Sequence, residues 1–187
     1  MEKEKKKVLI VIDVQNDFVT GSLGTPEAQE VVPDIIRKVN EYSERGDMII
    51  FTADTHHDDY LNTQEGKKLP VPHCIAGTRG WNFVPELDTN ESYTSSTMKK
   101  IYIKEQFGYN WNKLSWLNVY DIEIIGLVTD ICVVSNALIL KAAFPENEIT
   151  VDASCCAGST PERHRAALEV MKSCQINVIG ELGELNK

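Results

Sequence analysis

Six short segments of the sequence are almost continuously apolar and rich in β-branched residues, and they restrict the possible folds more than any other feature. Most of them do not alternate between apolar and polar residues, which is typical of strands buried on both faces of a parallel sheet. The expected strands cover residues 8–14, 48–54, 100–105, 122–128, 148–153 and 176–181.

Helical patterns occupy several of the gaps between these segments. We expect helices over residues 33–47, 111–120, 131–144 and 160–174. Pro33 fits the first turn of the first helix and Gly46 its end, while Thr160 is the expected N-cap of the last helix and Pro161 its first residue. Strands that alternate with helices predict an α/β fold, with a doubly wound, Rossmann-like sheet of about six mainly parallel strands and helices on both faces.

The length of 187 residues suits one domain with a sizeable core, so we expect a single domain over residues 1–187. No apolar run is long enough for a membrane span, and the short apolar segment that ends in Asp13 is not expected to be a signal peptide. The net charge of −9 argues against nucleic acid or an anionic membrane as a partner. Trp111 and Trp116 are candidates for exposed apolar residues, and a homo-oligomer is a further expectation.

The five cysteines, an odd number without regular spacing, predict reduced thiols in a cytoplasm rather than a set of disulfides. They are Cys74, Cys132, Cys155, Cys156 and Cys174.

Ligands of open parallel sheets bind beyond the carboxyl ends of the strands, so the residues found there are the first candidates for a site. The first expected strand ends in Asp13, the second in Asp54 and the third in Lys104. The fourth leads into the expected helix that carries Cys132. Two carboxylates, an ammonium group and a thiol are therefore expected at the same edge of the sheet.

Cys132 stands out among the cysteines because of its expected place in the first turn of a helix. The N–H groups and the positive end of the helix dipole favour a thiolate there and can hold an oxyanion, and Lys104 nearby would lower the thiol pKa further. The alternative is a small buried residue, which is what most free cysteines are.

Asp13 could likewise be a turn residue without a catalytic role. A semi-buried carboxylate, however, needs a partner such as Lys104 or Cys132.

The segment from residue 54 to 73 gathers side chains of the types that bind metals. They are Asp54, His56, His57, Asp58, Asp59, Glu65 and His73. Carboxylates and imidazoles suit one divalent ion, with Zn²⁺ as the first expectation and Mn²⁺ or Fe²⁺ as alternatives. Asp54 and His56 are two residues apart and point the same way on an extended segment. The alternative is a solvated acidic loop, because the spacing is irregular and matches no standard metal motif.

Four motifs, taken in chain order, resemble the isochorismatase-like cysteine hydrolases and, within them, the nicotinamidases. They are DVQNDF (13–18), TADTH with a later E and H (52–73), KEQFG (104–108) and GLVTDICV (126–133). The segment GTRG (77–80) adds to the nicotinamidase likeness, and the resemblance covers most of the chain. It implies a metal-assisted amidohydrolase of NAD salvage that converts nicotinamide and water into nicotinate and ammonia through a thioester with the enzyme.

The resemblance also implies a role for each matched residue. Cys132 would be the nucleophile, Asp13 the acid and base, and Lys104 the cation that orients them. The peptide bond between Leu127 and Val128 would be cis, and the amides of Val128 and Cys132 would form the oxyanion hole.

The same resemblance implies a metal site and a ring pocket. The implied metal ligands are Asp54, His56, His73 and a fourth residue, which is Glu65 or else His57. Phe18 would pack on the substrate ring, with Phe107 near it. The segment KLPVPH departs from the nicotinamidase pattern, because it offers Leu69 or Pro70 where those enzymes often carry a tryptophan.

Two other functions stay open beside the nicotinamidase reading. One is another cysteine hydrolase of the same superfamily that acts on an N-carbamoyl, ureido or other small amide and usually needs no metal. The second is a non-catalytic module that binds a metal or ligand, in which Cys132 would be unreactive. True isochorismatases lack the cysteine, so Cys132 argues against that activity.

Overall fold

The computed structural model describes residues 6–87 and 98–181 of the chain. Six strands form one sheet in the order β3-β2-β1-β4-β5-β6, and every neighbouring pair is parallel. The strands are β1 (Lys6–Ile12), β2 (Met48–Asp54), β3 (Lys99–Lys104), β4 (Tyr120–Leu127), β5 (Ile149–Ala157) and β6 (Asn177–Ile179). This confirms the expected α/β fold. The strand order reverses at β1 and β4, which is where open parallel sheets bind ligands.

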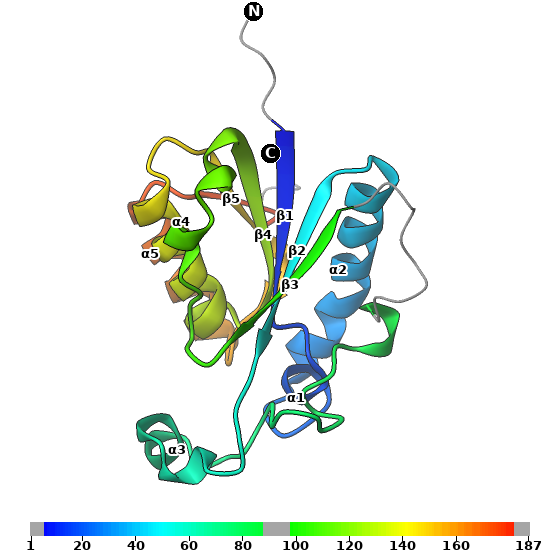
Figure 1. Ribbon diagram of the computed structural model, residues 1–187, viewed down its shortest axis with the longest axis vertical. Helices are drawn as coiled ribbons and strands as arrows, with labels where there is room; N and C mark the ends of the chain where they lie inside the picture. The colour runs from blue at the N-terminus through cyan, green and yellow to red at the C-terminus, as the bar shows by residue number, and fades with distance from the viewer. Residues whose placement is uncertain (1–5, 88–97, 182–187) are drawn as a thin grey trace, which may run out of the picture.

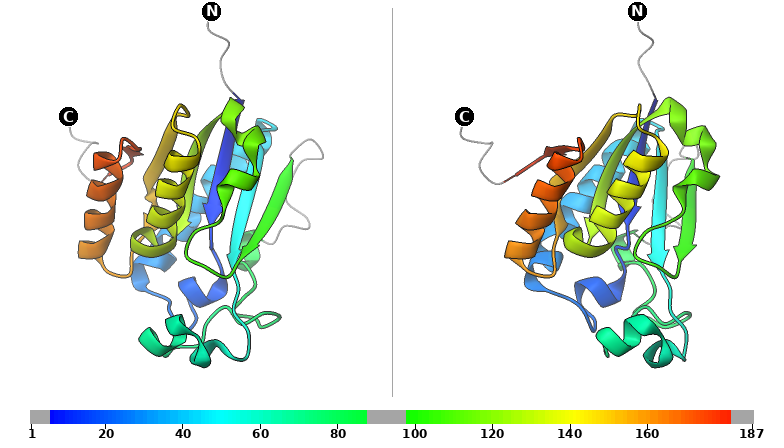
Figure 2. Two further views of the ribbon diagram at one scale, coloured as in Figure 1. Left: turned by 60° about the vertical axis from the view of Figure 1, so that its left-hand side comes forward. Right: turned by 90° about the vertical axis from the view of Figure 1, so that its left-hand side faces the viewer.

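Helices cover both faces of the sheet, as Figures 1 and 2 show. Helix α2 (Pro26–Glu44) packs on one face, while α4 (Val134–Ala143) and α5 (Pro161–Ser173) pack on the other. The short helices α1 (Asn16–Val19) and α3 (Gln64–Lys68) lie beyond the carboxyl ends of the strands. Single turns of 3₁₀ helix span Tyr60–Asn62, Pro85–Leu87, Trp111–Lys113 and Ser115–Val119, and a π-helical turn spans Thr129–Val133.

No helix of residues 6–87 and 98–181 is long and apolar enough to cross a lipid bilayer.

Successive residues of β1 belong to two different hydrophobic cores. Val8, Ile10 and Ile12 pack toward α4 and α5, whereas Leu9 and Val11 pack toward α2. All five side chains are fully buried. The central strand therefore needs apolar residues at every position, which explains why its sequence does not alternate.

Helix α2 begins at Pro26, so the expectation that it begins near Pro33 is wrong. The hydroxyl of Thr25 accepts a hydrogen bond from the N–H of Ala28 at 3.0 Å, and Pro26 occupies the first helical position. Pro33 lies inside the helix. The same Thr-Pro pair starts α5, where Thr160 is the N-cap as predicted.

The helix expected over residues 111–120 is instead two short 3₁₀ helices. Trp111 explains part of this, because its indole N–H and the backbone N–H of Tyr109 both donate to the side-chain oxygen of Asn136, each at 2.9 Å. These bonds fix the segment against α4. Trp111 is fully buried and Trp116 is half-buried, so the expectation that both are exposed is wrong.

The expectation that the protein forms a homo-oligomer stays a prediction.

Candidate active site

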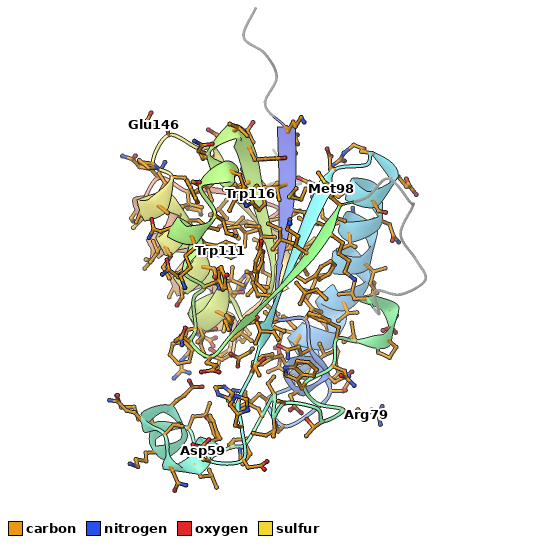
Figure 3. The ribbon with its side chains drawn as sticks, in the orientation of Figure 1. Asp59, Arg79, Met98, Trp111, Trp116 and Glu146 are labelled. Carbon is orange, nitrogen blue, oxygen red and sulfur yellow. The ribbon has the colours of Figure 1, made fainter. Side chains whose placement is uncertain are left out.

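The side chains expected at the strand ends do meet at one edge of the sheet. Asp13 follows β1, Asp54 and Lys104 are the last residues of β2 and β3, and Cys132 lies in the π-helical turn after β4. The loops between residues 55 and 80 lie beyond this edge, and Figure 3 labels Asp59 and Arg79 within them.

Lys104 connects the two carboxylates and the thiol. Its Nζ lies 2.7 Å from Asp13 Oδ2, 2.9 Å from Asp54 Oδ1 and 3.6 Å from Cys132 Sγ. Burial alone would lower the pKa of Lys104, but the charges of Asp13 and Asp54 outweigh burial and raise the pKa above its usual value. The lysine is therefore a buried cation with two anionic partners.

Asp13 is fully buried, and Thr52 holds one of its oxygens. The Thr52 hydroxyl donates to Oδ1 at 2.6 Å, and the Asp13 N–H lies 3.3 Å from the Thr52 carbonyl oxygen. The ammonium of Lys104 forms an ion pair with Oδ2, which accepts no well-aligned hydrogen bond from the described residues. Burial raises the pKa of Asp13 despite the opposing effect of Lys104. A buried carboxyl group with a raised pKa, held between Thr52 and Lys104, is suited to moving a proton.

The pKa of the Cys132 thiol is raised, so the expectation that it would be lowered is wrong. Burial raises the pKa of Cys132 well above its usual value, Asp13 raises it further, and Lys104 offsets only part of this. The surrounding backbone also differs from the first turn of an α-helix, because the Val128 carbonyl accepts hydrogen bonds from the N–H groups of Ile131 and Val133, both at 3.1 Å. The resting thiol is therefore protonated and needs a base before it can attack.

The backbone before this turn packs tightly against β1. The peptide bond between Leu127 and Val128 is cis, as the resemblance implies. Gly126 has a φ of 121°, and a Cβ at this position would overlap the carbonyl oxygen of Ile12. Only glycine fits there, so the close approach of β4 to β1 brings the Cys132 turn next to Asp13.

Four side chains that offer metal-binding atoms converge beside Lys104. This donor cluster consists of Asp54, His56, Glu65 and His73. Oδ2 of Asp54 lies 3.1 Å from His56 Nε2 and 3.5 Å from His73 Nε2. Oε1 of Glu65 lies 3.5 Å and 3.8 Å from the same two nitrogens. Three of the four residues are buried, with Glu65 on the more exposed side.

The chemistry of the donor cluster fits a divalent transition-metal ion. Two imidazole nitrogens and two carboxylate oxygens are ligands that Zn²⁺, Mn²⁺ and Fe²⁺ accept. Nδ1 of His73 lies 2.9 Å from the carbonyl oxygen of Val71. Donation from Nδ1 to that carbonyl leaves Nε2 as the unprotonated nitrogen that faces the other donors, which is how metal-binding histidines are commonly oriented.

The two candidates for the fourth ligand lie in different places. Glu65 belongs to the donor cluster, whereas the side chain of His57 is 59% exposed and its Nε2 lies 3.4 Å from Glu105 Oε1. Asp58 and Asp59 are also exposed. Of the seven candidate side chains in this segment, the structure thus brings four together.

Two aromatic rings pack against the histidines of the donor cluster. The ring of Phe18 is buried and lies 5.6 Å from the ring of His73, whereas Phe107 is 45% exposed. Tyr60 was not among the expected site residues, yet its ring lies 4.7 Å from that of His56 and 5.1 Å from that of His73. It is the one Tyr, Phe or Trp between residues 55 and 73, which is the signal that would have found it.

Thr52 is a second site residue that the sequence reasoning missed. It is the one polar side chain in β2 before Asp54, and the two residues are two positions apart and so share a face of the strand. Thr52 pairs with Ile12 across β1 and β2, which places its hydroxyl beside Asp13.

Comparison with known proteins places the chain among characterised relatives. The family model for the isochorismatase domain matches residues 7–181. The nicotinamidase/pyrazinamidase of Mycobacterium tuberculosis is 26% identical over 194 residues, which cover 92% of this chain and 98% of that protein.

Two solved structures show the same fold. The nicotinamidase/pyrazinamidase of Bacillus subtilis has a TM-score of 0.80 at 27% identity, covering 92% of this chain and 98% of that one. The pyrazinamidase of Pyrococcus horikoshii, solved in complex with zinc, has a TM-score of 0.76 at 26% identity, covering 94% and 99%.

Proposed function

The chain belongs to the isochorismatase domain family, and we propose that it is an amidohydrolase that cleaves nicotinamide into nicotinate and ammonia. The observation that carries the proposal is the position of Lys104, whose ammonium lies 2.7 Å from the candidate base and 3.6 Å from the candidate nucleophile. The relatives named nicotinamidase and pyrazinamidase support the choice of substrate. The proposal includes one domain over residues 1–187 and a setting in cytoplasmic NAD salvage.

In the proposed first half-reaction, the sulfur of Cys132 attacks the carboxamide carbon while Asp13 takes the thiol proton. Lys104 keeps the base oriented and balances its charge. The oxyanion is held by the backbone N–H groups of Val128 and Cys132. When the carbon–nitrogen bond breaks, Asp13 returns the proton to the nitrogen, and ammonia leaves behind a thioester on Cys132.

The second half-reaction regenerates the enzyme. Asp13 is again a carboxylate and takes a proton from water as the water oxygen attacks the thioester carbon. The carbon–sulfur bond then breaks, the sulfur recovers a proton, and the carboxylic acid leaves. One base thus serves both halves, which is consistent with the raised pKa of Asp13 and its position on the ion pair with Lys104.

The donor cluster is the proposed holder of one divalent ion, with Asp54, His56, Glu65 and His73 as the ligands. A bound ion would supply a Lewis acid for a lone pair of the substrate. Phe18 beside His73 supplies an apolar wall, and Phe107 stays a prediction as a second one. Zn²⁺ is the first choice because of the ligand types.

Ammonia release from nicotinamide by the purified protein tests the proposal directly. Release that is lost after chelation and restored by a divalent ion would support a metal-assisted nicotinamidase. Absence of release from a metal-loaded protein would reject nicotinamide as the substrate. N-carbamoyl and ureido amides should be assayed in parallel, because Leu69 is half-buried and Pro70 is exposed where nicotinamidases often carry a tryptophan.

A further inference from the structure

Asp17 takes no part in the proposed reaction, yet the fold leaves space for its carboxylate and for little else. It lies in α1, directly before Phe18. A Cβ at Gly80 would overlap both carboxylate oxygens of Asp17, and a Cβ at Gly21 would overlap Oδ1. The N–H of Asp17 also donates to the Gly80 carbonyl at 3.0 Å. Two glycines from different segments therefore form a close-fitting space around this one side chain.

The carboxylate of Asp17 reaches the backbone next to a candidate metal ligand. Oδ2 accepts a hydrogen bond from the N–H of Cys74 at 2.8 Å, and Cys74 directly follows His73. Cys74 has a φ of 46°, a left-handed conformation that residues other than glycine rarely adopt. A charged acceptor on its N–H stabilises the chain in that conformation and so fixes the backbone position of the preceding residue, His73.

The same backbone unit also holds the second histidine. The carbonyl of Cys74 accepts a hydrogen bond from the N–H of His56 at 2.9 Å, and the His56 carbonyl accepts one from Ala76 at 2.8 Å. Asp17 is thus connected through the single residue Cys74 to the backbones of both His56 and His73.

The neighbouring residue Gln15 makes a comparable contact with a third candidate ligand. Its Nε2 donates to the carbonyl of Asp54 at 2.9 Å, and its Oε1 accepts from the N–H of Asp54 at 2.8 Å. Gln15 is fully buried. Gln15 and Asp17 therefore both bind backbone groups in or next to the donor cluster, although neither residue belongs to it.

We propose that Asp17 is a positioning residue of the donor cluster, which orders the backbones of His56 and His73 so that their imidazoles face Asp54 and Glu65 before an ion binds. This inference rests on the metal site of the proposed function. Alanine at position 17 removes the acceptor for Cys74, whereas asparagine keeps one side-chain oxygen that can accept the same hydrogen bond.

The test is the dissociation constant for Zn²⁺, measured on the full-length protein by competition with a chelator of known affinity. Asp17→Ala should weaken Zn²⁺ binding by about 10- to 100-fold, which is typical of residues that orient metal ligands. Asp17→Asn should recover part of the loss. Gly80→Ala should weaken binding as well, because its methyl group displaces the carboxylate without altering any donor. Asp34→Ala is the matched control, since Asp34 is half-exposed on α2 and pairs with Arg37.

Each outcome decides the inference. Wild-type Zn²⁺ affinity in a folded Asp17→Ala protein overturns it, even if the melting temperature falls, because that pattern is a purely structural role. If Asp17→Ala does not fold, unchanged affinity in both Asp17→Asn and Gly80→Ala overturns it. A wild-type protein that binds no Zn²⁺ overturns both this inference and the metal site. Weakened binding in the variants of a protein that does not cleave nicotinamide supports this inference and rejects only the substrate.

Discussion

Lys104 and Asp13 form an ion pair with both side chains fully buried, and 2.7 Å separates Nζ from Oδ2. Removing two charges from water is costly, so a pair of this kind contributes little net stability compared with apolar residues of the same volume. The third group at the same ammonium is the Cys132 thiol, at 3.6 Å. The arrangement therefore adds little to the stability of the fold and is consistent with the proposed proton transfer at the thiol.

Replacing Lys104 by methionine should destabilise the protein strongly, because Asp13 and Asp54 would be left buried without their cation. The expected loss is about 3–5 kcal/mol in the free energy of unfolding, measured by urea denaturation at neutral pH. The double variant Lys104→Met with Asp13→Asn should lose less than the sum of the two single variants. Strict additivity would mean that the two side chains are not coupled in solution.

Cys132→Ala should lower kcat for amide hydrolysis by roughly 10³-fold or more, because the covalent route is removed. Cys156→Ala is the matched control, since Cys156 is also a buried cysteine and packs in the same hydrophobic core as Cys132. It should keep most of the activity. Retention of more than a few per cent of activity by a folded Cys132→Ala protein would reject the nucleophile assignment.

The sequence was sufficient to place Asp13, Asp54 and Lys104, because a parallel sheet delivers the last residue of each strand to the same edge whatever the loops do. The state of the Cys132 thiol was not accessible in this way. Its pKa depends on how completely the site is enclosed and on the distances to the charges of Asp13 and Lys104, and neither is written in the local sequence.

The fourth member of the donor cluster shows the same limit. The resemblance favours Glu65 as the fourth ligand and leaves His57 as the fallback, because the sequence does not say how the loop folds back. In the structure the hydroxyl of Thr63 accepts from the N–H of Gly66 at 3.0 Å and starts α3, which places Glu65 in its first turn. His57 instead faces Glu105, which follows β3 and is distant in the sequence.

His164 should make stability depend on pH. Its Nδ1 lies 2.8 Å from the hydroxyl of Thr129, the first residue of the turn that carries Cys132. Burial lowers the pKa of His164 below its usual value, although Asp130 and Glu181 act in the opposite direction. The folded protein therefore binds this proton more weakly than the unfolded chain does. The stability that His164 contributes is present above the pKa of the unfolded chain and is lost as pH falls through the folded pKa.

The free energy of unfolding should consequently fall more between about pH 7.5 and about pH 5.5 in the wild type than in His164→Gln. Urea denaturation at the two pH values measures this difference. Equal pH dependence in the two proteins would show that His164 titrates alike in the folded and unfolded states.

His56 and His57 are adjacent in the sequence but face different surroundings, so they form a matched pair for testing the metal site. His56→Ala removes one of the four donors, whereas His57→Ala removes an imidazole that is 59% exposed and lies against Glu105. After loading with Zn²⁺ and dialysis, the metal content should fall well below that of the wild type in His56→Ala and stay unchanged in His57→Ala. The rise in melting temperature on adding Zn²⁺ should follow the same pattern, because an ion that binds only the folded state stabilises it. Equal losses in the two variants would place His57 among the ligands, and no loss in either would reject the donor cluster as a metal site.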